Sequence, residues 1–197
     1  MLPSPGKLEL NTNGCFYESI NKAGYGGVLR DSSGKWVLGY YGKATSTSSL
    51  EVEIWAIYRG LTVIFKKGIS SVILEFDSSV TVNFCNEGPP PDHPWHDYGV
   101  VGISYDVSRE LVTSLIWAVV PKFVTHPQRH IIEEVRRLAG GTNSIITHIY
   151  RQANQTADCL ARLGSQQEDD LIVTSSIPFA AREFALADAM GVGHLRT

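Results

Sequence analysis

The sequence predicts an α/β fold in which helices flank a mixed five-stranded sheet. Three short strand-like segments come first, a long segment with helical periodicity follows them, and strands then alternate with helices. Hydrophobic residues make up 43% and charged residues 19% of the 197 residues. This composition is typical of a globular domain with a sizeable core, and it excludes a disordered or fibrous chain.

The first three predicted strands cover residues 7–12, 25–30 and 35–41. Residues 7–12 alternate between polar and apolar side chains and run into Asn13-Gly14, which predicts a strand ending in a turn. Asp31-Ser32-Ser33-Gly34 separates the next two strands, and because Asp and Gly tolerate the dihedral angles of tight turns, it predicts a hairpin. The chain therefore opens with three antiparallel strands.

A long helix is predicted after these strands. Ser48 or Ser49 can cap its start, Glu53 suits its first turn, and Gly68 ends it. The apolar residues at helical spacing, which we assign to the core, are Ile54, Ile57, Leu61 and Ile64.

The later elements complete the predicted order β-β-β-α-β-α-α-β-α. They are a buried strand over 72–77, helices over 80–85 and 131–138, a strand over 144–150 and a helix over 154–163. The right-handed crossover rule places the fourth strand beside the first, which gives the sheet order 3-2-1-4-5 with strand three at an edge.

The domain organisation follows from these elements. We expect one domain over residues 7–164, an atypical insertion at about 95–125, and a C-terminal tail over 165–197 with a weak helix at 180–190. The insertion has no clear periodicity. It forms either a surface lid or a segment outside the core fold, and a retained intron would also account for it.

Charge and cysteine content exclude several classes of protein. The net charge is −3, so nucleic-acid contacts would have to come from local patches. The three cysteines lack a C-x-x-C spacing, which argues against a disulfide framework or a zinc site. The longest apolar stretch, residues 111–120, is too short for a membrane span, and residues 1–6 lack the apolar core of a signal peptide. We therefore expect an intracellular protein, with the nucleus and the cytoplasm both open.

Four polar side chains fall at the ends of predicted core elements. They are Asn13, Glu53, Asp77 and Asp158. In the predicted sheet, Asn13 and Asp77 emerge side by side, and the two helices can bring the other two to the same edge. Carboxylates that converge repel one another unless a cation holds them, and oxygen ligands of this kind suit Mg²⁺ or Mn²⁺.

Several spaced motifs resemble the type 1 ribonuclease H domain. They are LELNTNG at 8–14, GYGGVLRD at 24–31, EIWAIYRGL at 53–61, EFDS at 75–78 and RQANQTADCLA at 151–161. In detail the chain is similar to plant ribonuclease H-like domains related to the RNase H regions of non-LTR retrotransposons. The resemblance covers roughly residues 7–94 and 127–193 and leaves out the atypical insertion.

The resemblance implies endonucleolytic hydrolysis of the RNA strand of RNA–DNA hybrids by two Mg²⁺ or Mn²⁺ ions. Asp77 would hold the ion that activates water, Glu53 and Asp158 would hold the second ion, and Asn13 takes the position of the bridging carboxylate. Contacts to the nucleic acid are expected from Gly14, Asn154 and Arg151. The implied partner is the hybrid alone, bound by a monomer without a membrane or an obligate protein partner.

Asn13 is the main departure from the family pattern. A neutral amide in place of a bridging carboxylate loses most of the electrostatic attraction for two divalent ions. Two functions therefore remain open at this point. One is a metal-dependent hybrid ribonuclease, and the other is a catalytically degenerate nucleic-acid-binding module of retroelement origin.

Overall fold

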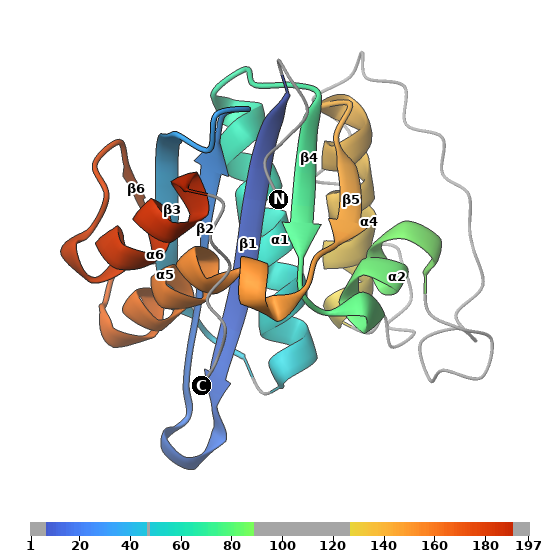
Figure 1. Cartoon of the computed structure of the whole chain (residues 1–197). Coiled ribbons are helices and arrows are strands. Elements are labelled where there is room, and N and C mark those ends of the chain that lie inside the picture. The colour runs from blue at the N-terminus through green and yellow to red at the C-terminus, as the bar shows by residue number, and fades with distance from the viewer. Residues whose placement is uncertain (1–6, 47, 89–126, 191–197) are drawn as a thin grey trace, which may run out of the picture.

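The computed structural model describes residues 7–46, 48–88 and 127–190, and these form a mixed sheet with helices on both faces (Figure 1). The predicted insertion at 95–125 lies outside the described residues. The strands are β1 (Leu8–Tyr17), β2 (Lys22–Arg30), β3 (Trp36–Ala44), β4 (Val72–Phe76), β5 (Ile145–His148) and β6 (Ile172–Thr174).

The strand order is β5-β4-β1-β2-β3-β6, which confirms the predicted order 3-2-1-4-5 and adds a sixth strand. β1, β2 and β3 are antiparallel, whereas β4 runs parallel to both β1 and β5. The prediction that strand three lies at an edge is wrong, because β6 pairs with β3 in antiparallel fashion. A strand of only three residues is too short to produce a readable alternation.

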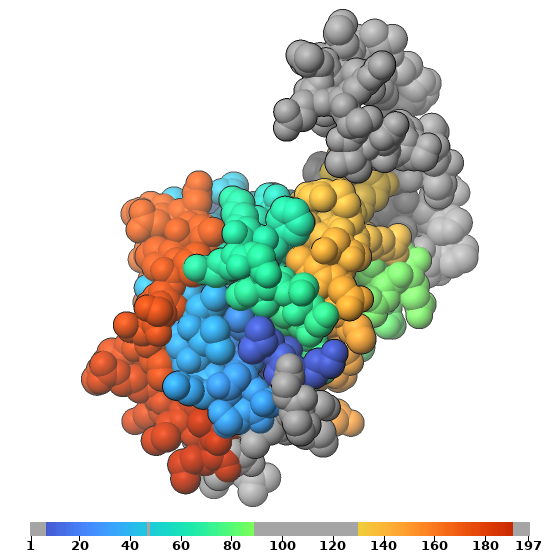
Figure 2. All heavy atoms as spheres, turned by 90° about the horizontal axis from the view of Figure 1, so that it is seen from above, coloured from blue at the N-terminus to red at the C-terminus, as the bar shows by residue number. Residues whose placement is uncertain are grey.

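Helices cover the two faces unequally. They are α1 (Ser49–Lys66), α2 (Ser79–Glu87), α4 (Pro127–Gly141), α5 (Gln155–Gln166) and α6 (Arg182–Ala189), with short 3₁₀ turns at Glu18–Ile20, Arg151–Ala153 and Phe179–Ala181. Figure 2 shows α1 (teal) beside α4 (yellow) on one side of the blue strands, with the red C-terminal residues on the other. No helix in the described ranges is long and apolar enough to cross a membrane.

The main core lies between the sheet and α1. Leu10, Leu74 and Ile57 are fully buried there, as the helical spacing predicted for Ile57. The helix begins after Ser48, whose side chain accepts a hydrogen bond from the Glu51 backbone N–H at 3.3 Å.

β1 continues past the predicted turn at Asn13-Gly14. Asn13 pairs with Gly26 and the ladder runs on to Tyr17, so both residues lie within the strand. A Cβ atom at Gly14 would lie 2.8 Å from the Val52 carbonyl oxygen of α1. The glycine is therefore needed for the close approach of helix and strand. In the sequence, a glycine with this role cannot be told apart from a glycine in a turn.

On the opposite face, α5 packs directly against the backbone of β2. A Cβ atom at Gly26 would lie 2.5 Å from the Ala161 backbone nitrogen, and one at Gly24 would lie 2.2 Å from the nitrogen of Ser165. Glycines in β2 thus set the depth at which α5, the helix that carries Asp158, sits on the sheet.

We expect Gly26→Ala to destabilise the fold by about 1–3 kcal/mol, because the methyl group would push α5 away from β2. Thermal unfolding followed by circular dichroism measures the effect. Gly140→Ala is the matched control, since a Cβ atom there meets no atom within 4 Å. Equal melting temperatures for Gly26→Ala and the native chain would contradict the packing argument.

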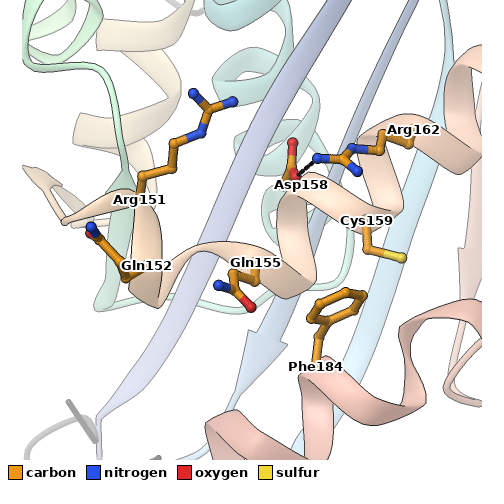
Figure 3. A pocket seen from close by; sticks show the side chains of 7 residues that line it. All are labelled: Arg151, Gln152, Gln155, Asp158, Cys159, Arg162 and Phe184. Carbon is orange, nitrogen blue, oxygen red and sulfur yellow. Dashed lines mark hydrogen bonds and ion pairs between the residues drawn. The ribbon is translucent and has the colours of Figure 1, made fainter. Parts of the chain in front are cut away.

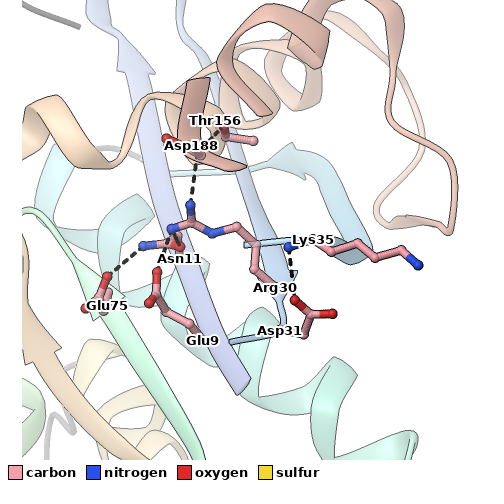
Figure 4. A network of polar contacts seen from close by, with 8 residues as sticks. All are labelled: Glu9, Asn11, Arg30, Asp31, Lys35, Glu75, Thr156 and Asp188. Carbon is pink, nitrogen blue, oxygen red and sulfur yellow. Dashed lines mark hydrogen bonds and ion pairs between the residues drawn. The ribbon is translucent and has the colours of Figure 1, made fainter. Parts of the chain in front are cut away.

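A buried polar network joins β1, β2, β4 and α6 (Figure 4). Arg30 lies 2.5 Å from Glu9 and 3.4 Å from Asp188, and it also donates to Asn11. Asn11 in turn donates to Glu75 at 3.0 Å. The network attaches the C-terminal helix α6 to β1 and β2, two strands that are far from this helix in sequence.

Burial, followed by the nearby charge of Glu9, raises the pKa of Glu75 to about 7. Glu75 is therefore protonated in the folded state between its unfolded pKa of about 4.3 and pH 7. The native chain should be stabilised by this proton below the unfolded pKa and lose that contribution as the pH rises through 7.

We expect Glu75→Gln to leave stability unchanged near pH 4 and to raise it by about 1 kcal/mol at pH 8, allowing for the partial exposure of the side chain. Urea unfolding of both proteins at the two pH values tests this. A variant less stable than the native chain at pH 8 would show that the charged form of Glu75 is favoured in the fold.

Candidate functional site

The site begins where β4 ends and β1 continues. The last pair between these strands joins Asn11 and Glu75, so Asn13 and Asp77 each lie two residues beyond it. Asn13 was predicted at the end of its strand, and it lies instead within β1. β4 ends at Phe76, before Asp77.

Glu53 reaches the site from the first part of α1. One of its carboxylate oxygens accepts a hydrogen bond from the Thr81 hydroxyl at 2.5 Å, and Ser49 donates to the other at 3.5 Å. Thr81 lies at the start of α2, next to the Ser78 cap that follows Asp77. Sequence reasoning missed Thr81, and its only signal was its position three residues after a capping serine.

The structure brings the three predicted carboxylates to one cavity of about 530 Å³. Glu53, Asp77 and Asp158 all line it. The other lining residues are Gly14, Cys15, Phe16, Tyr17, Ser49, Ser78, Arg151 and Arg162. The extended part of β1 thus forms one wall, and α1 and α5 supply the carboxylates on either side.

Asn13 contacts one of the three carboxylates. It is 5% exposed, its side-chain oxygen accepts the Gly14 N–H at 2.8 Å, and its NH₂ group lies 3.5 Å from an Asp158 oxygen. The amide therefore presents hydrogen atoms, not an oxygen, to Asp158. A carboxylate in this position would repel Asp158 unless a cation lay between them.

Two arginines compensate the charges of the carboxylates. Arg162 lies 2.5 Å from Asp158, one turn away on α5, and Arg151 lies 3.9 Å from Asp77. Burial raises the pKa of Asp77, and the neighbouring Glu53 charge adds to this, while Arg151 opposes it. The Asp77 side chain is only 11% exposed, which explains why burial dominates.

The three residues assigned to nucleic-acid contact are placed differently. Arg151 is 71% exposed at the mouth of the cavity, and Gly14 lines its wall. Asn154 is only 1% exposed and donates to the Thr12 carbonyl at 3.0 Å. This hydrogen bond ties the start of α5 to β1. The expected contact of Asn154 with a nucleic acid stays a prediction.

The oxygen atoms around the site differ in their surroundings. The Glu53 charge helps to raise the pKa of Asp77, and the buried Asn154 Oδ1 has no hydrogen-bond partner in the described part of the chain. Asn13, in contrast, has its oxygen turned to Gly14. Within the described ranges, no three His, Cys, Asp or Glu side chains are close enough together to form a ligand group.

Sequence comparison gives two partial matches. Residues 11–104 match the family described as Reverse transcriptase-like. An Arabidopsis thaliana protein that is named as a ribonuclease H protein is 36% identical over 92 residues, which are 47% of this chain and 15% of that protein. The chain thus spans only a small part of this relative.

Solved structures show a similar fold at low sequence identity. RNase H1 of the archaeon Halobacterium salinarum has a TM-score of 0.56 at 18% identity, over 81% of this chain and 97% of that one. LC11-RNase H1, solved in complex with an RNA/DNA hybrid, has a TM-score of 0.55 at 18% identity, again over 81% and 97%. The chain therefore has a ribonuclease H-like fold, as its motifs predicted.

Proposed function

We propose that this ribonuclease H-like domain binds RNA–DNA hybrids and hydrolyses the RNA strand with the help of Mg²⁺ or Mn²⁺. The observation that carries the proposal is the single cavity lined by Glu53, Asp77 and Asp158. Similarity to ribonucleases H, one of them solved with a hybrid, supports the choice of substrate.

The residues of the chain have distinct tasks in this proposal. Asp77 would hold one cation, and Glu53 and Asp158 would hold a second. Thr81 would orient Glu53 through its hydroxyl. When bound, such ions activate the attacking water and stabilise the leaving oxygen of the phosphodiester. Arg151, mostly exposed beside Asp77, would bind a phosphate of the strand.

Cleavage of a labelled hybrid in Mg²⁺ and in Mn²⁺ tests the proposal. We expect cleavage that requires the metal and falls by about 100-fold or more in Asp77→Asn, since the substitution removes a charged ligand. Glu51→Gln is the matched control, because it removes a carboxylate two residues from Glu53 that does not line the cavity. Metal-independent cleavage, or equal rates in Asp77→Asn, would contradict the proposal.

The second candidate is a domain that binds hybrids without cleaving them. It is favoured by the contact between the Asn13 NH₂ group and Asp158, because this hydrogen bond satisfies the site without a cation. Measuring hybrid binding and cleavage on the same protein separates the candidates. Binding without cleavage supports the second one.

A further inference from the structure

A second cavity, of about 290 Å³, opens beside the carboxylate cavity and shares Arg151, Asp158 and Arg162 with it (Figure 3). The remaining lining residues are Gln152, Gln155, Cys159 and Phe184. Because the two cavities have a common boundary, a strand bound at the carboxylates can continue into the second one.

The boundary between the cavities carries the positive charge. The side chains of Arg151 and Arg162 are 71% and 54% exposed, so each has N–H groups available in addition to those near Asp77 and Asp158. These groups can bind a phosphate of a strand that crosses the boundary.

The rest of the second cavity is neutral and partly aromatic. Neither Gln152 nor Gln155 has a side-chain hydrogen bond to another described residue, so both amides are free to donate and accept. In Figure 3 the side chains of Gln155 and Phe184 lie on one side of the first turn of α5, and those of Arg151 and Asp158 lie on the other. Gln155 and Phe184 therefore form a neutral side of the cavity, and Gln152 lies beside Arg151.

This combination matches the chemistry of a nucleotide. An aromatic ring offers a stacking surface for any base, and free amides pair with the donors and acceptors at a base edge. A base inside a duplex is stacked and paired, so its edge and faces are already covered. Only an unpaired nucleotide presents both.

We propose that the cavity formed by Gln152, Gln155 and Phe184 binds an unpaired base next to the hybrid segment held at the carboxylates. The inference rests on the proposed function and adds a substrate preference to it. Hybrids flanked by a single-stranded tail are favoured over fully paired hybrids. The base stacks on Phe184, the amides contact its edge, and Arg151 holds the adjoining phosphate.

Binding of three hybrids in EDTA, where metal-dependent cleavage is suppressed, tests the inference. The first is a blunt hybrid. The second is the same hybrid with a short single-stranded tail, tested at one end and then at the other. The third is a blunt hybrid lengthened by as many base pairs as the tail has nucleotides. Fluorescence anisotropy gives the affinities. We expect the tail to tighten binding about tenfold relative to the lengthened blunt hybrid, the effect of stacking one base.

Two substitutions locate this preference. Phe184→Leu should remove most of it and Phe184→Tyr should keep it, because only the second retains an aromatic face. Gln155→Ala should weaken it without depending on the packing of α6. Leu186→Ala is the matched control on the same helix, since Leu186 is 63% exposed and does not line this cavity.

The outcomes separate the inference from the proposed function. Equal affinities for the tailed and the lengthened blunt hybrid, or a tail preference unchanged in both Phe184→Leu and Gln155→Ala, would overturn the inference alone. Failure to bind any of the three hybrids would overturn the proposed function and the inference with it. A tail preference that is lost in Phe184→Leu and retained in Phe184→Tyr supports the inference.

Discussion

Asn13→Asp is expected to raise the rate of hybrid cleavage in Mg²⁺ by about 100-fold or more. The present amide turns its oxygen to the Gly14 N–H and its NH₂ group to Asp158. A carboxylate would add a negative charge and a second oxygen at the position between the predicted metal ligands. The attraction of the site for divalent cations then increases strongly, because buried charges are poorly screened.

Single-turnover cleavage of a labelled hybrid by the native chain and by Asn13→Asp measures this effect. The double variant Asn13→Asp with Asp77→Asn is the control, since any gain must disappear when a second ligand is removed. Titration with Mn²⁺ followed by calorimetry reports cation binding separately from turnover. Unchanged cleavage and unchanged Mn²⁺ affinity in Asn13→Asp would show that the site is limited by something other than this residue.

The same substitution should lower the stability of the cation-free protein. Asp158 would lose a hydrogen-bond donor at 3.5 Å and gain a carboxylate neighbour, while its pair with Arg162 stays the same. A thermal melt in EDTA and in Mg²⁺ measures this, and the cation is expected to restore part of the loss. We therefore expect residue 13 to couple cation binding to the stability of the fold.

Sequence reasoning could predict the sheet because its signals are local. The apolar spacing of Ile54 and Ile57 and the turn residues around Gly34 each report on a few neighbouring positions. The order of the strands then follows from the handedness of the crossovers. Asp77 was predicted at the site because the end of its strand can be read from local sequence signals. Parallel neighbouring strands end at the same edge of a sheet, which is where the site was expected.

Features that depend on contacts between distant residues were not predictable in this way. Gly14 carries a turn signal in the sequence, but the structure uses it for contact with α1. Asn154 was expected at the nucleic acid, and only the packing of α5 on β1 shows that it is buried. The strand Ile172–Thr174 is too short for a periodic signal, so its pairing with β3 depends on the surrounding fold.

The Arg30 network is the clearest case of such a long-range contact, and Arg30→Met is expected to destabilise the fold by about 3–5 kcal/mol. The side chains of Arg30 and Glu9 are 6% and 3% exposed, so removing the arginine leaves a buried carboxylate without its counter-charge. Urea unfolding of the variant and the native chain measures the difference. Arg137→Met is the matched control, because its pair with Glu134 is exposed and should contribute less than about 1 kcal/mol.

The position of Asp188 adds a local effect to the global one. Asp188 lies 3.4 Å from Arg30 and accepts a hydrogen bond from Thr156 at 2.6 Å, so it connects α6 both to the sheet and to the start of α5. Asp188→Asn should therefore increase amide hydrogen exchange in α6 more than in β1. If exchange rose equally in both elements, α6 would unfold only together with the sheet. Exchange confined to α6 would show that the contacts of Asp188 with Arg30 and Thr156 hold the C-terminal helix, and with it Phe184, against the domain.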